Sequence, residues 1–266
     1  MKYAPILIAF LLLCPAAAAE TLSFSFDDWC PYTCMDPATQ QPDEAAPGYY
    51  VEILRAVFEP LGYDLEFVTR PWERAIEETR QGRLDAVLSP AKSEAPDLIF
   101  PAEEIGALAW CFYTKRKHDW EYGGLESLAG ETLGVLTGNY FGKELTRYVE
   151  DNKGDMKKVQ EITGLDFLAK NTNKLIAGRI SVMLDEPATT DYFIMVNHLE
   201  GMIRKANCVE SRNMYVAFSP LRATSEQYAL IFTQGMARLR ETGALKTILE
   251  KYGLTDWREA RSETAP

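Results

Sequence analysis

Histidine is scarce in this sequence, which contains only two, His118 and His198, among 266 residues. Neither lies close in the sequence to a pair of cysteines, and the most closely spaced cysteines, Cys30 and Cys34, have the pattern C-x3-C. This spacing does not indicate a zinc site. The G-x-S-x-G motif of serine hydrolases is also absent. We therefore expect no metal, no cofactor and no nucleophilic active site.

Positive charge is also in short supply. The chain has 28 Lys and Arg against 39 Asp and Glu, a formal net charge of −11. An acidic protein is repelled by phosphates, which argues against nucleic acid or an anionic membrane surface as a partner. We expect the partner to be a small molecule, bound by a monomer.

Long apolar runs are missing except near the N-terminus. Lys2 precedes an apolar stretch over residues 6–13, then Pro15 and four alanines at 16–19. This order predicts a secretory signal peptide over residues 1–19, cut after Ala19, and the stretch is too short to span a bilayer. A retained anchor is the alternative. We expect an exported, periplasmic protein with no direct membrane insertion.

Four cysteines follow the predicted cleavage site: Cys30, Cys34, Cys111 and Cys208. An even number of cysteines in an oxidising compartment indicates two disulfides. Three pairings are possible. We favour Cys30–Cys34, which would staple a loop, and Cys111–Cys208, which would join distant parts of the chain.

Two similar runs of alternating strands and helices predict an α/β fold. The first run has strands at 21–26, 65–68 and 86–88, with helical periodicity at 51–61 and 72–79. The second has strands at 132–136, 158–162 and 180–184, with helices at 140–151, 165–177 and 187–197. Each run predicts a lobe with an open, mainly parallel sheet flanked by helices.

The order of the elements predicts that one lobe is inserted into the other. After the second run come a strand at 214–218, helices at 225–240 and 244–252, and a polar tail over 255–266 that we expect to fray. We predict lobe 1 over 20–112 plus 213–266 and lobe 2 over 113–212, joined by a two-stranded hinge near 112–116 and 208–214. Since ligands of open parallel sheets bind beyond the carboxyl ends of the strands, a cleft between the lobes is expected.

Polar, charged and aromatic residues follow the predicted strands and are the candidate site residues. They are Asp27, Asp28, Trp29 and Tyr32; Arg70, Trp72 and Arg74; Ser89 and Lys92; Gly138, Asn139 and Tyr140; and Asp185. Each also has a purely structural interpretation. Trp72 could belong to the core, the charged residues could be solvated surface or turn caps, and Gly138–Asn139 could start a helix. Asp185 is the least easily explained as surface, because it directly follows an apolar strand. A carboxylate there is well placed to pair with a ligand cation.

Four sequence motifs follow one another in the order found in a known protein family. They are GYYVEILRAVFEPLGYDLEFV with QGRLDAVLS, then LGVLTGNYFGKEL, AGRISVMLDEPATTDYF and MARLRETGALKTILEKYG. Over about residues 21–254 the chain resembles the bacterial extracellular solute-binding proteins of the polar amino acid family, family 3, which have the type II periplasmic binding fold. The resemblance implies a two-lobed, non-enzymatic receptor that delivers an amino acid or related solute to an ABC permease.

The resemblance also implies roles for individual residues. Tyr32 and Trp72 match aromatic positions of the family. Ser89 matches the first polar residue after the Asp-Ala-Val sequence, which is residues 85–87 here. Gly138, Asn139 and Tyr140 match a turn that binds the ligand carboxylate through backbone N–H groups, and Asp185 matches the aspartate that binds the ligand ammonium.

One stretch departs from the family pattern. A Thr-x-x-Arg segment whose arginine clamps the ligand carboxylate is expected after DAV, but LSPAKSEAPDLIF has no arginine. Lys92 is its only cation, and Arg74 on the preceding helix is a possible substitute. Arg and Lys are not equivalent in bidentate carboxylate recognition, so the ligand need not be an ordinary amino acid.

Two other functions are compatible with the same residues. A periplasmic sensor would use the same closing cleft to report ligand occupancy to a membrane partner. An enzyme resembling cyclohexadienyl dehydratases would use cleft carboxylates such as Glu94 and Glu186 for acid–base chemistry. The two histidines lie in predicted linker and helix-end positions, which disfavours the enzyme.

Overall fold

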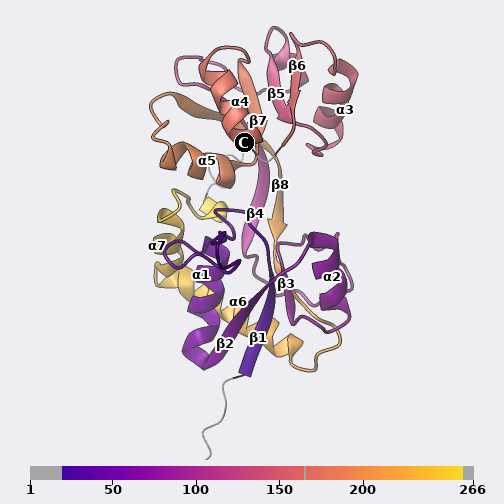
Figure 1. Ribbon diagram of the computed structural model, residues 1–266, viewed down its shortest axis with the longest axis vertical. Coiled ribbons are helices and arrows are strands. Elements are labelled where there is room, and N and C mark those ends of the chain that lie inside the picture. The colour runs from indigo at the N-terminus through magenta and orange to yellow at the C-terminus, as the bar shows by residue number, and fades with distance from the viewer. Residues whose placement is uncertain (1–19, 165, 260–266) are drawn as a thin grey trace, which may run out of the picture.

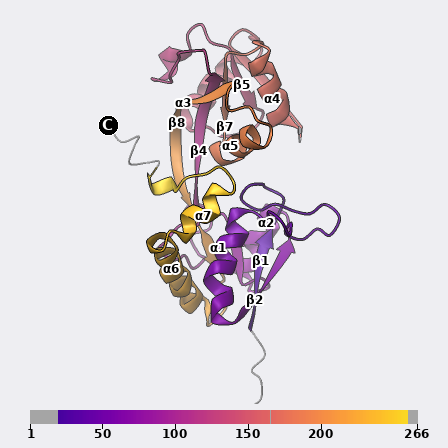
Figure 2. The ribbon, with the colours of Figure 1, turned by 90° about the vertical axis from the view of Figure 1, so that its left-hand side faces the viewer.

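The computed structural model describes residues 20–164 and 166–259 and has two open sheets (Figures 1 and 2). The first has the order β2-β1-β3-β9, with strands β1 (Glu20–Phe26), β2 (Tyr63–Thr69), β3 (Ala86–Leu88) and β9 (Val216–Phe218). The second has the order β6-β5-β7-β4-β8, with strands β4 (Gly106–Lys115), β5 (Leu133–Leu136), β6 (Val159–Ile162), β7 (Val182–Asp185) and β8 (Ile203–Met214). The predicted α/β fold is confirmed. Parallel pairing links β2, β1 and β3, and also β6, β5 and β7, whereas β9, β4 and β8 pair antiparallel.

Helices flank both sheets. The first lobe contains α1 (Tyr49–Phe58), η1 (Glu59–Leu61), α2 (Trp72–Arg80), α6 (Ser225–Glu241) and α7 (Ala244–Glu250). The second contains η2 (Leu125–Leu128), α3 (Lys143–Asn152), α4 (Phe167–Ile176) and α5 (Pro187–Val196). No helix within the described residues is both long and apolar enough to cross a membrane. The predicted signal peptide, residues 1–19, lies outside the described residues.

Close packing of α1 on α6 forms the core of the first lobe. A Cβ atom at Gly235 would lie 2.6 Å from Cγ1 of Val57, so only glycine permits this approach of α6 to α1. Phe58 and Phe232 are fully buried in the same cluster, together with Phe24 of β1. Because these side chains come from β1, α1 and α6, the C-terminal helices complete the lobe that the N-terminal strands begin.

The strands β4 and β8 join the lobes. They pair antiparallel from Gly106 opposite Met214 to Lys115 opposite Ile203, and both views show them running from one lobe into the other (Figures 1 and 2). The predicted two-stranded connection is therefore present. It is longer than expected, because the hinge was predicted only near 112–116 and 208–214, and the polar sequence over 203–207 did not predict a strand. The lobe boundaries predicted at residues 112 and 212 fall inside these strands and remain a prediction.

Two disulfides are present, with the favoured pairing. Cys111 of β4 is bonded to Cys208 of β8, and Cys30 is bonded to Cys34 in the loop after β1. The first bond crosslinks the two hinge strands, and Cys111 is fully buried. The second closes a short loop beside the cleft. Neither cysteine pair is available for metal binding.

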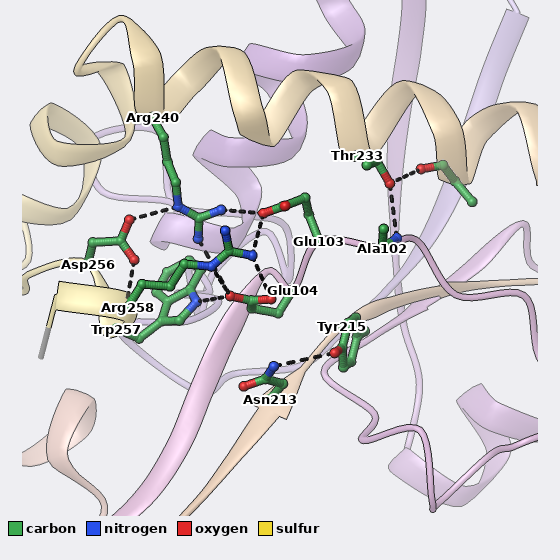
Figure 3. A network of polar contacts seen from close by, with 11 residues as sticks. Ala102, Glu103, Glu104, Asn213, Tyr215, Thr233, Arg240, Asp256, Trp257 and Arg258 are labelled. Carbon is green, nitrogen blue, oxygen red and sulfur yellow. Dashed lines mark hydrogen bonds and ion pairs between the residues drawn. The ribbon is translucent and has the colours of Figure 1, made fainter. Parts of the chain in front are cut away.

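The prediction of a frayed tail over 255–266 is wrong for residues 255–259, and residues 260–266 lie outside the described part of the chain. Trp257 is buried, and its Nε1 donates to Oε1 of Glu104 over 2.9 Å (Figure 3). Arg258 donates to the same carboxylate, and Nε of Arg240 donates to Asp256 over 2.8 Å. Glu104 precedes β4, so the C-terminal segment is fixed to the base of a hinge strand. Sequence polarity misled the prediction, because these charged groups are paired with one another.

Candidate ligand-binding cleft

Two adjoining cavities, of about 250 and about 500 Å³, lie between the lobes. Trp29, Leu108 and Arg212 line both of them, so the cavities form one cleft at the hinge. The smaller cavity opens mainly onto lobe 1 and the larger onto lobe 2. Volumes of this size are typical of sites for small molecules.

The loop after β1 supplies the aromatic surface of the cleft. Trp29 is stacked on Tyr32, with ring centroids 4.2 Å apart, and its backbone N–H donates to the carbonyl of Thr33 over 2.8 Å. Tyr32 itself is fully buried and lines neither cavity. A Cβ atom at Gly48 would lie 2.4 Å from the carbonyl oxygen of Tyr32, so this glycine lets the loop pack against the start of α1. The loop is thus a fixed platform for Trp29.

Ser89, directly after β3, has an unusual backbone conformation. Its φ of 73° lies in the left-handed region, which costs a non-glycine residue roughly 1–3 kcal/mol. The backbone N–H of Ser89 donates to the carbonyl of Tyr215 over 2.8 Å, and its hydroxyl lies 3.4 Å from that of Tyr50. Both Ser89 and Tyr50 line the smaller cavity. Strain that packing maintains at a cleft residue is consistent with a role in the site.

The loop between β5 and α3 lines the lobe 2 side with Gly138, Asn139, Tyr140 and Gly142. We predicted that Gly138 and Asn139 open a helix beginning at Tyr140, and this is wrong, because α3 begins at Lys143. Gly138 and Gly142 both have positive φ, 86° and 87°, and extend the loop across the cleft instead.

Two adjacent carboxyl groups, Asp185 and Glu186, line the larger cavity where β7 meets α5. Glu186 caps α5, because its side chain accepts from the backbone N–H groups of Ala188 and Thr189 and also from the Tyr32 hydroxyl. The last bond connects the two lobes. Burial raises the pKa of Glu186.

Asp185 has fewer partners. It is 4% exposed, and Oδ1 accepts from the backbone N–H of Glu186 over 2.8 Å. Within the described residues its Oδ2 atom has no hydrogen-bond partner. Burial, with a further contribution from the charge of Glu186, raises the pKa of Asp185 to about 7. An unpaired, desolvated carboxyl group at a cleft wall is best satisfied by a cationic group of a ligand.

The cleft is lined by more acidic than basic side chains. Asp27, Glu94, Asp185 and Glu186 line the two cavities, and within the described residues Arg212 is the only lysine or arginine that does so. Asp27 is reached by solvent, but the surrounding protein and neighbouring Asp28 raise its pKa.

Eight of the candidate site residues line the cleft: Asp27, Trp29, Trp72, Ser89, Gly138, Asn139, Tyr140 and Asp185. Five others do not line it, among them Arg70, whose Nε pairs with Glu78 over 2.7 Å. Tyr32 lies beneath Trp29, and Asp28 accepts from the backbone N–H of Met35 over 3.2 Å. Arg74 pairs with Glu78 over 2.7 Å, and Nζ of Lys92 lies 4.6 Å from the ring centroid of Tyr215. Neither proposed substitute for the missing arginine therefore lines the cleft.

Sequence reasoning overlooked several lining residues, notably Arg212, Trp110 and Phe167. Arg212 lies on β8, which the sequence pattern did not reveal as a strand. Trp110 follows Leu108 by two residues on β4, and both line the larger cavity, so its position could have been inferred from the side-chain period of that strand.

Part of the chain matches the model of a known protein family. Residues 26–97 match the family model of bacterial extracellular solute-binding proteins, family 3. This match confirms the predicted resemblance. The matched segment runs from the end of β1 to the loop after β3, and it contains Trp29, Trp72 and Ser89 of the cleft. No curated protein sequence matches the chain.

Solved structures show the fold. The second substrate binding domain of a putative amino acid ABC transporter from Streptococcus pneumoniae Canada MDR_19A is 17% identical, with 88% of this chain and 99% of that chain covered and a TM-score of 0.67. A histidine kinase sensor domain with similarity to periplasmic binding proteins is 21% identical, with 88% and 96% covered and a TM-score of 0.55. The ancestral amino acid-binding protein AncCDT-1, a precursor of cyclohexadienyl dehydratase, is 16% identical, with 87% and 94% covered and a TM-score of 0.55. The chain has the type II periplasmic binding fold.

Proposed function

We propose that the chain is an exported, monomeric solute-binding protein that captures a small polar solute with an amino or amide group and delivers it to an ABC-type permease. The observation that supports this most is Asp185, a buried carboxyl group with an unpaired oxygen at the wall of an interlobe cleft. A solute N–H group there would satisfy that oxygen, and the aromatic side chains of Trp29 and Trp110 would cover apolar parts of the solute. The match to family 3 supports the same role.

Thermal unfolding in the presence of candidate solutes tests this function, because a ligand that binds only the folded state raises the melting temperature. The solutes are amino acids, amines, amides, sugars and dicarboxylates. We expect at least one nitrogen-containing solute to stabilise the protein. If none of these classes shifts the melting temperature, the proposed function is wrong.

A substitution localises the site. Asp185→Ala should abolish the ligand-induced shift while circular dichroism shows an intact fold. Asp119→Ala changes an exposed aspartate that lines neither cavity, and it should keep the full shift. A full shift in Asp185→Ala would overturn the site assignment.

A sensor role is the second candidate, favoured by the structural likeness to a histidine kinase sensor domain. Both roles use the same ligand-bound cleft, so binding data do not separate them. Uptake by a permease encoded nearby, reconstituted with and without the protein, does so. Uptake that depends on the protein supports transport, and regulation of a neighbouring sensor kinase supports signalling.

A catalytic role receives less support from the site. Glu94 accepts from the backbone N–H of Ala91 and from Arg212, and Glu186 caps α5, so the carboxylates considered for acid–base chemistry have structural partners. We therefore propose a binding protein rather than an enzyme. Incubation with prephenate and assay for phenylpyruvate tests this, and formation of product would overturn it.

A further inference from the structure

The carboxylates of the cleft differ in what remains available to a ligand. One oxygen of Glu94 accepts from Arg212 and the other from the backbone N–H of Ala91. Both oxygens of Glu186 accept hydrogen bonds at the cap of α5. Within the described residues, Asp27, Asp185 and Glu186 form no ion pair, but both oxygens of Glu186 are taken by the cap of α5. Asp27 and Asp185 are therefore the two cleft carboxyl groups that a ligand cation can pair with while the ion pair of Glu94 and the helix cap of Glu186 stay in place.

These two groups belong to opposite lobes. Asp27 directly follows β1 and lines the smaller cavity, and Asp185 ends β7 and lines the larger one. The cavities adjoin at Trp29, Leu108 and Arg212, and the first two offer apolar and aromatic surface between them. Each carboxyl group thus lies at or just beyond the carboxyl end of a strand, on either side of this junction, where the guanidinium group of Arg212 is paired with Glu94.

We propose that the cleft takes a small organic dication, a linear diamine without a carboxylate, with one ammonium group at Asp27, the other at Asp185, and its methylene chain across Trp29 and Leu108. This rests on the proposed solute-binding function and specifies its ligand class. Closure of the lobes on such a molecule would pair both carboxylates with opposite charge. Trp29 would also attract the cation through its ring face.

Zwitterionic amino acids fit this charge distribution poorly. Their carboxylate would enter a cleft in which the only guanidinium group contributed by the described residues, that of Arg212, already pairs with Glu94 over 3.1 Å. The segment that lacks the arginine expected of family members contributes Glu94 to the cleft instead. A like charge without compensation disfavours binding, so the cleft discriminates against a carboxylate as well as attracting ammonium groups.

The test compares solutes that differ by one group, by isothermal titration calorimetry on the mature protein. The pairs are 1,5-diaminopentane with lysine and 1,4-diaminobutane with ornithine, which differ by the α-carboxylate, and 1-aminobutane is the monoamine. We expect the better diamine to bind at least tenfold more tightly than its amino acid and than the monoamine. Equal or tighter binding of lysine or ornithine, or of the monoamine, would overturn the inference.

The outcomes separate this inference from the proposed function. If neither diamine binds but an amino acid, an amide or another solute does, the dication inference is wrong and the solute-binding function stands. If no solute of any class binds, both are wrong. Binding of a diamine tenfold tighter than its amino acid supports both.

Substitutions then show which group each ammonium contacts. Asp27→Asn should weaken diamine binding at least tenfold and monoamine binding less than threefold, because the monoamine needs only one carboxylate. Asp64→Asn makes the same change at an exposed position at the start of β2 and should leave both affinities unchanged. If Asp27→Asn binds the diamine as tightly as the unmodified protein, Asp27 does not contact the ligand. Melting temperatures without solute verify that both variants are folded.

Discussion

Nη1 of Arg212 lies 3.1 Å from Oε1 of Glu94, so the hinge strand β8 is tied to the loop after β3 inside the cleft. The side chains are 50% and 31% exposed, which makes this a partly solvated pair whose partners can be exchanged at low cost. Under the proposed function, Glu94 competes with a ligand carboxylate for the only guanidinium group of the described cleft lining.

Removing one partner should change the preferred ligand class. In Glu94→Gln the guanidinium of Arg212 is released, and affinity for amino acids should rise relative to diamines by about threefold to fivefold, corresponding to roughly 1 kcal/mol for an exposed pair. Arg212→Gln should have the opposite effect, because Glu94 then adds an uncompensated negative charge. Calorimetry with lysine and 1,5-diaminopentane measures the ratio. Arg55→Gln, on the outer face of α1, is the control, and a shift of the same size there would show that net charge alone is responsible.

Ligand affinity should depend on pH through Asp185. Since burial raises the pKa of this group to about 7, part of the protein carries a neutral Asp185 at neutral pH. Only the ionised form attracts an ammonium group. Affinity for a cationic solute should therefore fall as pH decreases from 8 to 5, by at most about tenfold per unit below the pKa. Asp185→Asn should bind weakly with a flat profile, and an unchanged slope in this variant would assign the dependence to another group.

The stability of the unliganded protein should change with pH in the opposite direction. The pKa of Asp185 in the folded state lies above its ordinary value of 3.8. The folded state therefore binds the extra proton, and its stabilisation is present below about pH 4 and lost as pH rises through about 7. At pH 8, Asp185→Asn should melt at a higher temperature than the unmodified protein, by about 2–4 °C for each kcal/mol of unfolding free energy gained. Calorimetric scans at pH 5 and 8 show whether the difference between the two proteins grows with pH.

The parts of the fold that the sequence predicted are those with a hydrophobic period. Strands β1, β3 and β5 appear as short, mostly buried apolar runs, and the buried residues of helices α4 and α6 recur every three or four positions. The strand β8 shows no such pattern. Its sequence IRKANCVESRNM is polar, and the partner strand β4 supplies its hydrogen bonds. Arg212 was missed as a consequence.

The positions of the candidate residues were predicted well where the backbone alone determines them. They were predicted poorly where an ion-pair or hydrogen-bond partner determines the direction of the side chain. Ser89 and Asp185 follow strands and lie in the cleft as expected. Arg74 has an equally suitable sequence position, but Glu78 on the same helix binds it. Choosing among such partners requires the distances between side chains, which spacing in the sequence does not provide.

The two disulfides should differ in their effect on stability. In the chain-entropy description, a crosslink stabilises more when it closes a longer loop. Cys111 and Cys208 are 97 residues apart, whereas Cys30 and Cys34 are 4 apart. Removing the first pair by Cys111→Ser with Cys208→Ser should cost about 4–5 kcal/mol of unfolding free energy, and the corresponding change at Cys30 and Cys34 about 2 kcal/mol. Urea denaturation measures both, and mass spectrometry of the exported protein, which should find no free thiols, checks the pairing.

Loss of the Cys30–Cys34 bond should weaken ligand binding as well as stability. This bond closes the loop that presents Trp29 to both cavities. Without it the loop gains freedom that binding must remove, so affinity should decrease in addition to the loss of about 2 kcal/mol of unfolding free energy. If the double serine variant at these positions binds its ligand with unchanged affinity, the packing of Trp29 on Tyr32 alone fixes the platform.

Glu104 at the base of β4 should be essential for stability because its carboxylate is buried and multiply paired. Its side chain is 5% exposed, and it accepts from Trp257 over 2.9 Å and from Arg258 over 2.6 Å (Figure 3). Burial opposes ionisation, but the hydrogen bonds from Arg258 and Trp257 outweigh it and lower the pKa to about 2. Glu104→Gln leaves Arg258 with Glu103 as its remaining carboxylate partner and removes the buried charge that Arg258 compensates, so it should lower the unfolding free energy by about 3 kcal/mol.

The same substitution has a pH signature that a simple packing defect lacks. Because the pKa of Glu104 is lowered in the folded state, its stabilisation is present above about 4.5, the ordinary value, and is lost as pH falls through about 2. The difference between the unmodified protein and Glu104→Gln should therefore be largest near pH 6 and shrink below pH 4. Glu66→Gln, a change at an exposed position on β2, should have the same unfolding free energy as the unmodified protein both near pH 6 and below pH 4. A pH-independent loss of stability in Glu104→Gln would mean that the shape of the side chain matters and its charge does not.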